Sequence, residues 1–187
     1  MNENAETEHG GGQAPGPLGQ TDSFPTDAEL SRSLMESTRK GVLSTLTPDS
    51  YPYGSLVSHV TSEGGDPIIL ISDLAEHTQN VRLENRASFL INTASSIEGD
   101  PLSGARLTLV GKMELLDDPG ALGDLYLSKH PYAGGYADFK DFNYWKLVVE
   151  RCRFVGGFGH MSWMDATAYS QAAADPFSPN AEHAIEH

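Results

Sequence analysis

Short runs of apolar residues recur along this 187-residue chain, and glycine, proline or small polar residues bound each run. Such runs, with alternating or continuous apolar character, are typical of β-strands joined by tight turns. The run 68–71 is apolar at every position, which is typical of a strand buried on both faces at the centre of a sheet. We expect strands at 42–47, 55–61, 68–71, 87–93, 106–116, 142–153 and 161–164.

Three further stretches carry helix signals. Thr26 and Glu29 fit a capping box in front of an amphipathic stretch that ends at Gly41. A second helix is expected at about 74–84, and a third begins with a proline in its first turn and covers 119–129. The sequence therefore predicts an α+β, mainly β fold, in which an antiparallel barrel carries two or three short helices.

The composition separates a central domain from two tails. Residues 1–25 are rich in Gly and Pro and are predicted to be disordered, residues 26–164 form the domain, and residues 165–187 form an acidic tail. The formal net charge of −14 falls largely on the tails, which carry acidic residues and neither Lys nor Arg. Because the chain has no basic stripe, we expect no nucleic-acid partner.

Other bulk features exclude further classes of protein. No apolar run approaches the ~20 residues of a membrane-spanning helix, so we expect no membrane partner. The first residues lack the basic start and apolar stretch of a signal peptide. Cys152 is the only cysteine, which excludes an internal disulfide and indicates a cytoplasmic protein.

The stretch 71-ISDLAEHTQN-80 is the most informative for binding, because an apolar strand there leads directly into a helix. A helix N-terminus presents unpaired amides and a partial positive charge, which together form a ready anion site. The side chains that would add hydrogen bonds to a phosphate are Ser72, His77, Thr78 and Asn80. In the alternative reading, Ser72 or Asp73 only caps the helix and His77 lies at the surface.

The stretch 52-PYGSLVSHV-60 is a second candidate, because Gly54 stands where a strand begins and lets a ligand lie against the backbone. The positions that would line such a ligand are Ser55, Leu56 and Val57. The alternative is an ordinary strand entry after a turn, and His59 is expected to be structural. The sequence contains no zinc-binding, nucleophile-elbow or dinucleotide-binding motif.

The stretch 154-FVGGFGH-160 separates the last two expected strands. Glycine tolerates positive φ and strand bulges that other residues resist, so the stretch predicts a bend in the chain. The alternative is a backbone that must approach a ligand closely at Gly157.

In this order, the segments resemble the pyridoxamine 5′-phosphate oxidase-like split barrels. The resemblance rests on 41-GVLSTL-46, 52-PYGSLV-57, 67-PIILISDLAEHTQNVRLENRASFLI-91 and 106-RLTLVGKMELL-116. Residues 130-HPYAGGYADFKDFNYWKLVVERCRFVGGFGHMSW-163 are similar to the HugZ-type haem oxygenases and the CREG-like split barrels, and the likeness covers about residues 28–164. It implies an antiparallel split β-barrel that forms a homodimer, with a small-molecule ligand in the cleft between the two barrels.

The flavin-binding members of that family imply FMN as the first expected cofactor, and a flavin-dependent oxidoreductase of unknown substrate as the first expected function. The cofactor-binding residues that the likeness implies are Ser55, Leu56, Val57, Ser72, His77, Thr78, Asn80, Arg106 and Gly157. The strand arginine of the true oxidases falls at Ser55, and their helix-start lysine falls at about His77. A neutral histidine holds phosphate less firmly than lysine. The C-terminal segment with which the oxidases grip pyridoxal has no match, so pyridoxamine phosphate oxidation is not expected.

The HugZ-type members imply haem as the alternative cofactor in the same dimer cleft, with haem degradation as the function. Their iron ligand is a histidine near the C-terminus, which corresponds here to His183 or His187, and Arg106 would stand on the other side of the iron. His160 is a rival ligand because it directly follows the glycine stretch. The CREG-like members imply a third reading, a non-enzymatic interaction module.

Overall fold

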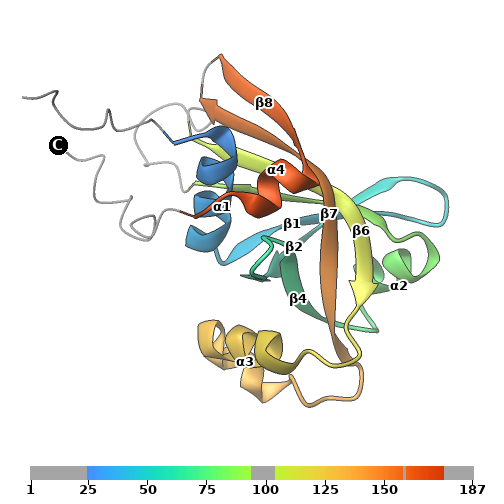
Figure 1. Cartoon of the computed structure of the whole chain (residues 1–187). Helices are drawn as coiled ribbons and strands as arrows, with labels where there is room; N and C mark the ends of the chain where they lie inside the picture. The colour runs from blue at the N-terminus through green and yellow to red at the C-terminus, as the bar shows by residue number, and fades with distance from the viewer. Residues whose placement is uncertain (1–24, 94–103, 158, 175–187) are drawn as a thin grey trace, which may run out of the picture.

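One curled antiparallel sheet dominates the structure, and short helices pack against its ends and one side (Figure 1). The structure is a computed structural model that describes residues 25–93, 104–157 and 159–174. The strands are β1 (Lys40–Leu46), β2 (Pro52–Ser58), β3 (Val60–Thr61), β4 (Pro67–Ser72), β5 (Arg86–Asn92), β6 (Arg106–Leu115), β7 (Phe142–Gly157) and β8 (His160–Asp165). The helices are α1 (Asp27–Ser37), α2 (Glu76–Leu83), α3 (Gly120–Lys129), the 3-10 helix η1 (Pro131–Gly135) and α4 (Ala166–Gln171). The predicted mainly β fold with short helices is confirmed.

The strand order is β2-β1-β5-β6-β7-β4-β3, and β8 pairs with β7 off this path. The long strand β7 pairs with β4 near its start, with β6 along most of its length and with β8 near its end. The sheet curls into a half-barrel that encloses the main apolar core (Figure 1). β8 and α3 lie at opposite ends of the molecule (Figure 1).

β4 is apolar along its length because both of its faces are covered. Ile69 and Ile71 belong to the barrel core, whereas Ile68 and Leu70 pack in a second cluster with Tyr126 of α3. This burial confirms the prediction for the run, but its expected place at the centre of the sheet is wrong. β4 lies between β7 and the two-residue strand β3, and α3 covers its second face.

The glycine stretch forms the hairpin between β7 and β8. β7 continues further than predicted, so that Gly157 still pairs with His160. Gly159 has a φ of +82°, a left-handed conformation that glycine adopts without the steric cost other residues meet. The predicted bend is therefore confirmed.

The pairing of β6 with β7 contains a bulge near the middle of both strands. Val110 pairs with Arg151 while Gly111 pairs with Val149, which leaves Glu150 as the extra residue. A bulge of one residue shifts every following side chain to the other face of the strand.

The bulge decides which side chains of β7 face the core. Before it, Val149 is buried, and after it Cys152 and Phe154 are buried. Arg151 and Arg153 alternate with these buried residues and therefore point away from the core. Without the bulge, the alternation would turn both arginines inward.

α4 lies beyond residue 164, where the sequence placed the end of the domain, and it packs beside α1 (Figure 1). The fully buried Tyr169 donates a hydrogen bond to the Gly65 carbonyl at 2.9 Å. The buried Arg32 of α1 donates to the Ser170 carbonyl at 3.1 Å and to the Glu63 carbonyl at 2.7 Å. The packed helix α4 thus extends past residue 164 to Gln171. The sequence did not predict it because six residues with one buried aromatic side chain show no helical period.

The helices in the described ranges are too short or too polar to cross a membrane.

Candidate functional site

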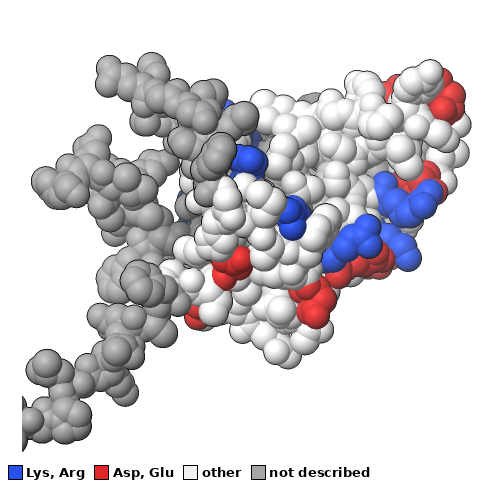
Figure 2. All heavy atoms as spheres, turned by 90° about the horizontal axis from the view of Figure 1, so that it is seen from above, with Lys and Arg blue, Asp and Glu red and all other residues white. Residues whose placement is uncertain are grey.

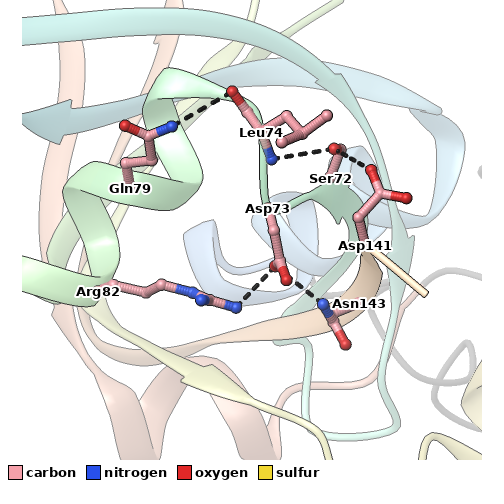
Figure 3. A network of polar contacts seen from close by, with 7 residues as sticks. All are labelled: Ser72, Asp73, Leu74, Gln79, Arg82, Asp141 and Asn143. Carbon is pink, nitrogen blue, oxygen red and sulfur yellow. Dashed lines mark hydrogen bonds and ion pairs between the residues drawn. The ribbon is translucent and has the colours of Figure 1, made fainter.

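Ser72 lies at the end of β4, where its hydroxyl already has two partners (Figure 3). It donates to Asp141 Oδ2 at 2.7 Å and accepts from the Leu74 amide at 3.1 Å. The Ala75 amide donates to the Ser72 carbonyl at 3.1 Å, and Ala75 is the N-cap residue of α2. These contacts favour a local structural role for Ser72 over a role as a phosphate donor.

Asp73, the next residue, holds the start and end of α2 in place (Figure 3). Its Oδ1 accepts from Arg82 Nη2 at 2.7 Å and from Asn143 Nδ2 at 2.9 Å. Its amide donates to the Asp141 carbonyl at 2.6 Å. The junction therefore combines two carboxylates with one guanidinium.

A phosphate group does not fit the start of α2 in this arrangement. The carboxylates of Asp73 and Asp141 would repel it, and the Ser72 hydroxyl proton is already directed at Asp141. The amides of Asp73 and Leu74 also have partners. The family likeness would place the phosphate of FMN here. That phosphate needs hydrogen-bond donors, but the groups at this position are the carboxylates of Asp73 and Asp141.

The other predicted phosphate donors lie on α2 and face the interior. Thr78 is fully buried, and Asn80 donates from Nδ2 to Thr45 Oγ1 at 3.1 Å. Burial lowers the pKa of the half-buried His77, which keeps its imidazole neutral. Within the described ranges, His77 Nε2, Thr78 Oγ1 and Asn80 Oδ1 are buried without a hydrogen-bond partner. Thr78 and Asn80 are therefore covered by the barrel end and are not presented to a ligand at the surface.

The predicted residues of β2 divide between the two faces of the sheet. Val57 is buried in the core, Ser55 is half-buried, and Leu56 is 68% exposed. Leu56 therefore lies on the outer face, which we define as the face of the sheet opposite the barrel core.

The cross-strand register places a row of side chains on this outer face. One residue comes from each of six adjacent strands: Leu56, Val42, Leu90, Thr108, Arg153 and Trp163. Leu90 is 40% exposed and Trp163 is 58% exposed. Leu90 and Leu56 flank Val42 on one part of the row, and Trp163 lies beyond Thr108 and Arg153 at its other end. Exposed apolar side chains on one face are typical of ligand-binding or protein-binding surfaces.

Three arginines share the outer face with this row. Arg106 pairs with Val155 of β7, which pairs in turn with the exposed Met161 of β8. Arg151 and Arg153 lie there because of the bulge. The predicted Arg106 is thus brought together with two arginines that the sequence reading missed.

Trp163 lies across both of these additional arginines. The guanidinium carbon of Arg151 is 5.8 Å from the centre of the indole ring, and that of Arg153 is 5.6 Å from it. Cations at this distance from an aromatic face are attracted by its quadrupole. The alternation of arginines with buried residues over 151–154 is the signal that would have found Arg151 and Arg153, but the bulge decides which of the two sets faces the core.

His160 and Ser162 point to the opposite side of β8, toward α1. His160 Nε2 lies 2.7 Å from Asp27 Oδ1, and the Ser162 hydroxyl donates to the other oxygen of the same carboxylate. Since residues alternate along a strand, His160 faces away from Trp163 and the arginines. His160, the rival iron ligand, therefore lies on the opposite side of β8 from Trp163 and the arginines, and these contacts do not test its role as a ligand.

Three predicted site residues are not tested by these contacts. His183 and His187 lie outside the described residues. Gly157 pairs with His160 at the tip of the hairpin, and this pairing does not test its role beside a ligand. In the part of the chain that is described, no three His, Cys, Asp or Glu side chains come together in a way that would hold a metal ion.

Charges of both signs mix on the surface seen from above (Figure 2). At the right of this view Lys and Arg side chains stand next to Asp and Glu side chains, and the basic side chains nearer its centre stand singly rather than in one continuous field. Long basic stripes are typical of nucleic-acid binding, and this view shows none.

Comparisons with known proteins give one similar solved structure and two similar plant proteins. The chain is 41% identical to a heme binding protein from Mycobacterium smegmatis, whose structure matches with a TM-score of 0.81 over 88% of this chain and 68% of that one. It is 30% identical over 164 residues, or 83% of this chain, to the chloroplastic non-canonical heme oxygenase HOZ of Arabidopsis thaliana. It is 25% identical over 162 residues, or 86% of this chain, to the chloroplastic glutamyl-tRNA reductase-binding protein of the same plant. It spans 50% and 47% of the length of these two plant proteins.

A more distant structural match extends the fold assignment. Campylobacter jejuni ChuZ matches with a TM-score of 0.62 at 22% identity over 79% of this chain and 63% of that one, which is evidence for the fold alone. The predicted split-barrel fold is confirmed by these matches. The family model of the CREG β-barrel matches residues 23–171, and the chain therefore belongs to the CREG β-barrel family.

Proposed function

We propose that this chain binds haem on the outer face of its sheet, beside Trp163 and the arginines 106, 151 and 153. The observation that carries the proposal is the meeting of exposed apolar side chains with three guanidinium groups on one face. The 41% identity to a heme binding protein of M. smegmatis over most of the chain supports haem as the ligand.

The chemistry of the outer face suits haem. The porphyrin is flat and apolar over most of its area, and its edge carries two propionate carboxylates. Leu90, Met161 and Trp163 offer exposed apolar surface to the ring. Guanidinium groups bind carboxylates with paired hydrogen bonds, so the arginines of this face are suited to the propionates.

An iron ligand for this site would come from the segment after Ala174. His183 and His187 stand there, and the stretch from Ala174 to His183 can span up to about 30 Å when extended. α4, which packs against β7 and β8, fixes the point from which that segment starts. When bound, haem would supply an iron centre able to bind and activate oxygen, as an imidazole-ligated haem does in other proteins.

FMN is the second candidate, and the family likeness is its support. The fit at the start of α2 argues against it, because Ser72 already donates to Asp141 and the carboxylate of Asp73 lies beside them. The CREG-like reading, an interaction module without enzymatic activity, is the third candidate. The homodimer also stays a prediction.

A parallel titration of the full chain with haemin and with FMN tests the proposal. We expect haemin to saturate at one per chain, with a Soret band and a dissociation constant of about 1 µM or below. FMN should show no saturable change at the same concentrations. Absence of saturable haemin uptake would contradict the proposal, and tight FMN binding would favour the second candidate.

Two further experiments identify the iron ligand and distinguish haem degradation from haem binding alone. Replacing His183 and His187 together by Ala should alter the Soret spectrum if the tail supplies the iron ligand. Loss of the Soret band on addition of a reductant and oxygen would indicate haem degradation, whereas a stable spectrum would indicate haem binding alone. Light scattering with and without haemin reports the oligomeric state.

A further inference from the structure

We propose that Trp163 is the side chain on which the tetrapyrrole ring stacks, and that Arg151 and Arg153 hold its propionates. The site would then recognise the ring and its carboxylates, and it would bind metal-free protoporphyrin as well as haem. This inference rests on the proposed haem function and assigns its recognition to named residues.

The exposure of Trp163 is the first observation. The chain has two tryptophans, of which Trp145 is 5% exposed in the core and Trp163 is 58% exposed on the outer face. A large aromatic side chain gains most when its surface leaves water, so an exposed indole on a well-paired strand is a poor contributor to folding. The same indole is a ready platform for a flat aromatic ligand.

The two arginines are the second observation. Their guanidinium carbons lie 5.8 Å and 5.6 Å from the centre of the Trp163 ring, so the indole holds both heads on one side of the hairpin. Arginine side chains held in this way lose less freedom when they bind a carboxylate. Two oriented guanidinium groups match the two propionates at one edge of a porphyrin.

The two acidic residues near Arg151 and Arg153 each have another partner. Asp165 pairs with Arg151 across the two strands, and its Oδ1 accepts from the Ala168 amide at 2.8 Å at the start of α4. Glu150, the bulge residue, lies 3.5 Å from Lys112 on the neighbouring strand. Arg153 pairs across from Trp163 itself rather than from an acid.

The arrangement depends on the bulge in β7. Glu150 is the extra residue that turns Arg151 and Arg153 to the outer face, where Trp163 stands opposite Arg153. A strand with regular alternation would have placed the arginines and the tryptophan on different sides. Bulges commonly re-aim side chains next to binding sites, which accords with a ligand here.

Protoporphyrin IX without metal is the probe that tests ring recognition, and the absorbance of the porphyrin itself is the readout, because it reports binding equally in chains with and without Trp163. We expect the full chain to bind it with a saturable absorbance change. Trp163→Ala should weaken binding of both protoporphyrin and haemin about tenfold, while Trp163→Phe should lose less because it keeps a ring. Phe139→Ala is the matched control, since Phe139 is a similarly exposed aromatic residue (56%) that lies away from β8 in the chain, and it should bind as the unchanged protein does.

The salt dependence of binding tests the role of Arg151 and Arg153. Arg151→Ala combined with Arg153→Ala should weaken protoporphyrin binding about tenfold and should reduce its dependence on salt, because the carboxylate contacts are lost. Circular dichroism before each titration confirms that the variants are folded.

The outcomes separate this inference from the proposed function. If the unchanged chain binds haemin but not protoporphyrin, or if Trp163→Ala binds both as tightly as the unchanged chain, the stacking inference is wrong and the haem function stands. If the unchanged chain binds neither compound, the proposed function fails as well.

Discussion

Gly111 of β6 lies so close to Val148 of β7 that a Cβ atom at Gly111 would come 1.9 Å from the Val148 carbonyl oxygen. No side chain can occupy that space without moving the backbone. The glycine stands at the bulge, where Glu150 is left over and the faces of β7 exchange. The placement of Arg151 and Arg153 on the outer face therefore depends on the missing side chain of Gly111.

Gly111→Ala is predicted to destabilise the protein by about 2–3 kcal/mol, because the added carbon forces β6 and β7 apart. Urea unfolding followed by circular dichroism measures the change. Gly54→Ala in β2 is the matched control, since its Cβ would meet only Val42 Cγ1 at an ordinary 3.5 Å. An equal effect of the two substitutions would show that the close approach at the bulge has no special role.

The same bulge marks the limit of what the sequence predicts. Alternation and turn residues were sufficient to place most strands and the capping box of Thr26, whose contacts with Glu29 are all present. The expected strand 55–61 is the exception, because it begins at Pro52 and is divided at His59 into β2 and β3. The bulge itself follows from how β6 and β7 fit together, which no local pattern records. Arg151, Arg153 and Trp163 were therefore missed, although each of them lies in an expected strand.

The predicted phosphate site shows the converse error, in which a local pattern predicts a binding site that the folded structure does not favour. The pattern around Ser72, His77 and Thr78 has the composition of an anion site at a helix start. Asp141, far along the chain, meets Ser72 there and reverses the electrostatic character of the site. A reading of one segment cannot include a partner that only the fold brings in.

Stability should fall in mild acid because of His59. Burial lowers the pKa of this imidazole from its ordinary value of 6.5 to about 4, so the unfolded chain binds a proton that the folded chain does not between these values. The stability from this group is fully present above about pH 6.5 and falls by about 2–3 kcal/mol as the pH approaches 4.

Unfolding free energies measured between pH 7.5 and 4 for the unchanged chain and for His59→Gln test this claim. The variant should lose less stability over the range because residue 59 no longer titrates. Parallel curves for the two proteins would contradict the assignment to His59.

The contact of His160 with Asp27 should fasten the β7–β8 hairpin to α1. A double-mutant cycle of Asp27→Asn and His160→Gln at pH 6 is predicted to give a coupling of about 0.5–1 kcal/mol, since the pair is partly exposed. The exposed pair of Lys112 and Glu150, 3.5 Å apart, is the control and should give almost none. A coupling at Asp27 no larger than that of the control would mean that the hairpin is held by other contacts.

Tyr169 should anchor α4 through its hydroxyl as well as its ring. Tyr169→Phe leaves the Gly65 carbonyl without this donor and is predicted to cost about 1–2 kcal/mol in urea unfolding. Ser170→Ala, which removes an exposed hydroxyl that contacts Thr167, should change stability little. Faster amide exchange in residues 166–171 of the Phe variant alone would locate the effect; an unchanged variant would show that the hydroxyl is dispensable.

The central claim is that haem lies on the outer face beside Trp163. The chain's two tryptophans give two indole N–H signals in an NMR spectrum of nitrogen-labelled protein, and paramagnetic ferric haem broadens the signals of nearby protons. On addition of haemin, the Trp163 signal should disappear first, while that of the core residue Trp145 persists. A Trp163 signal that stays sharp at saturating haemin would contradict the account.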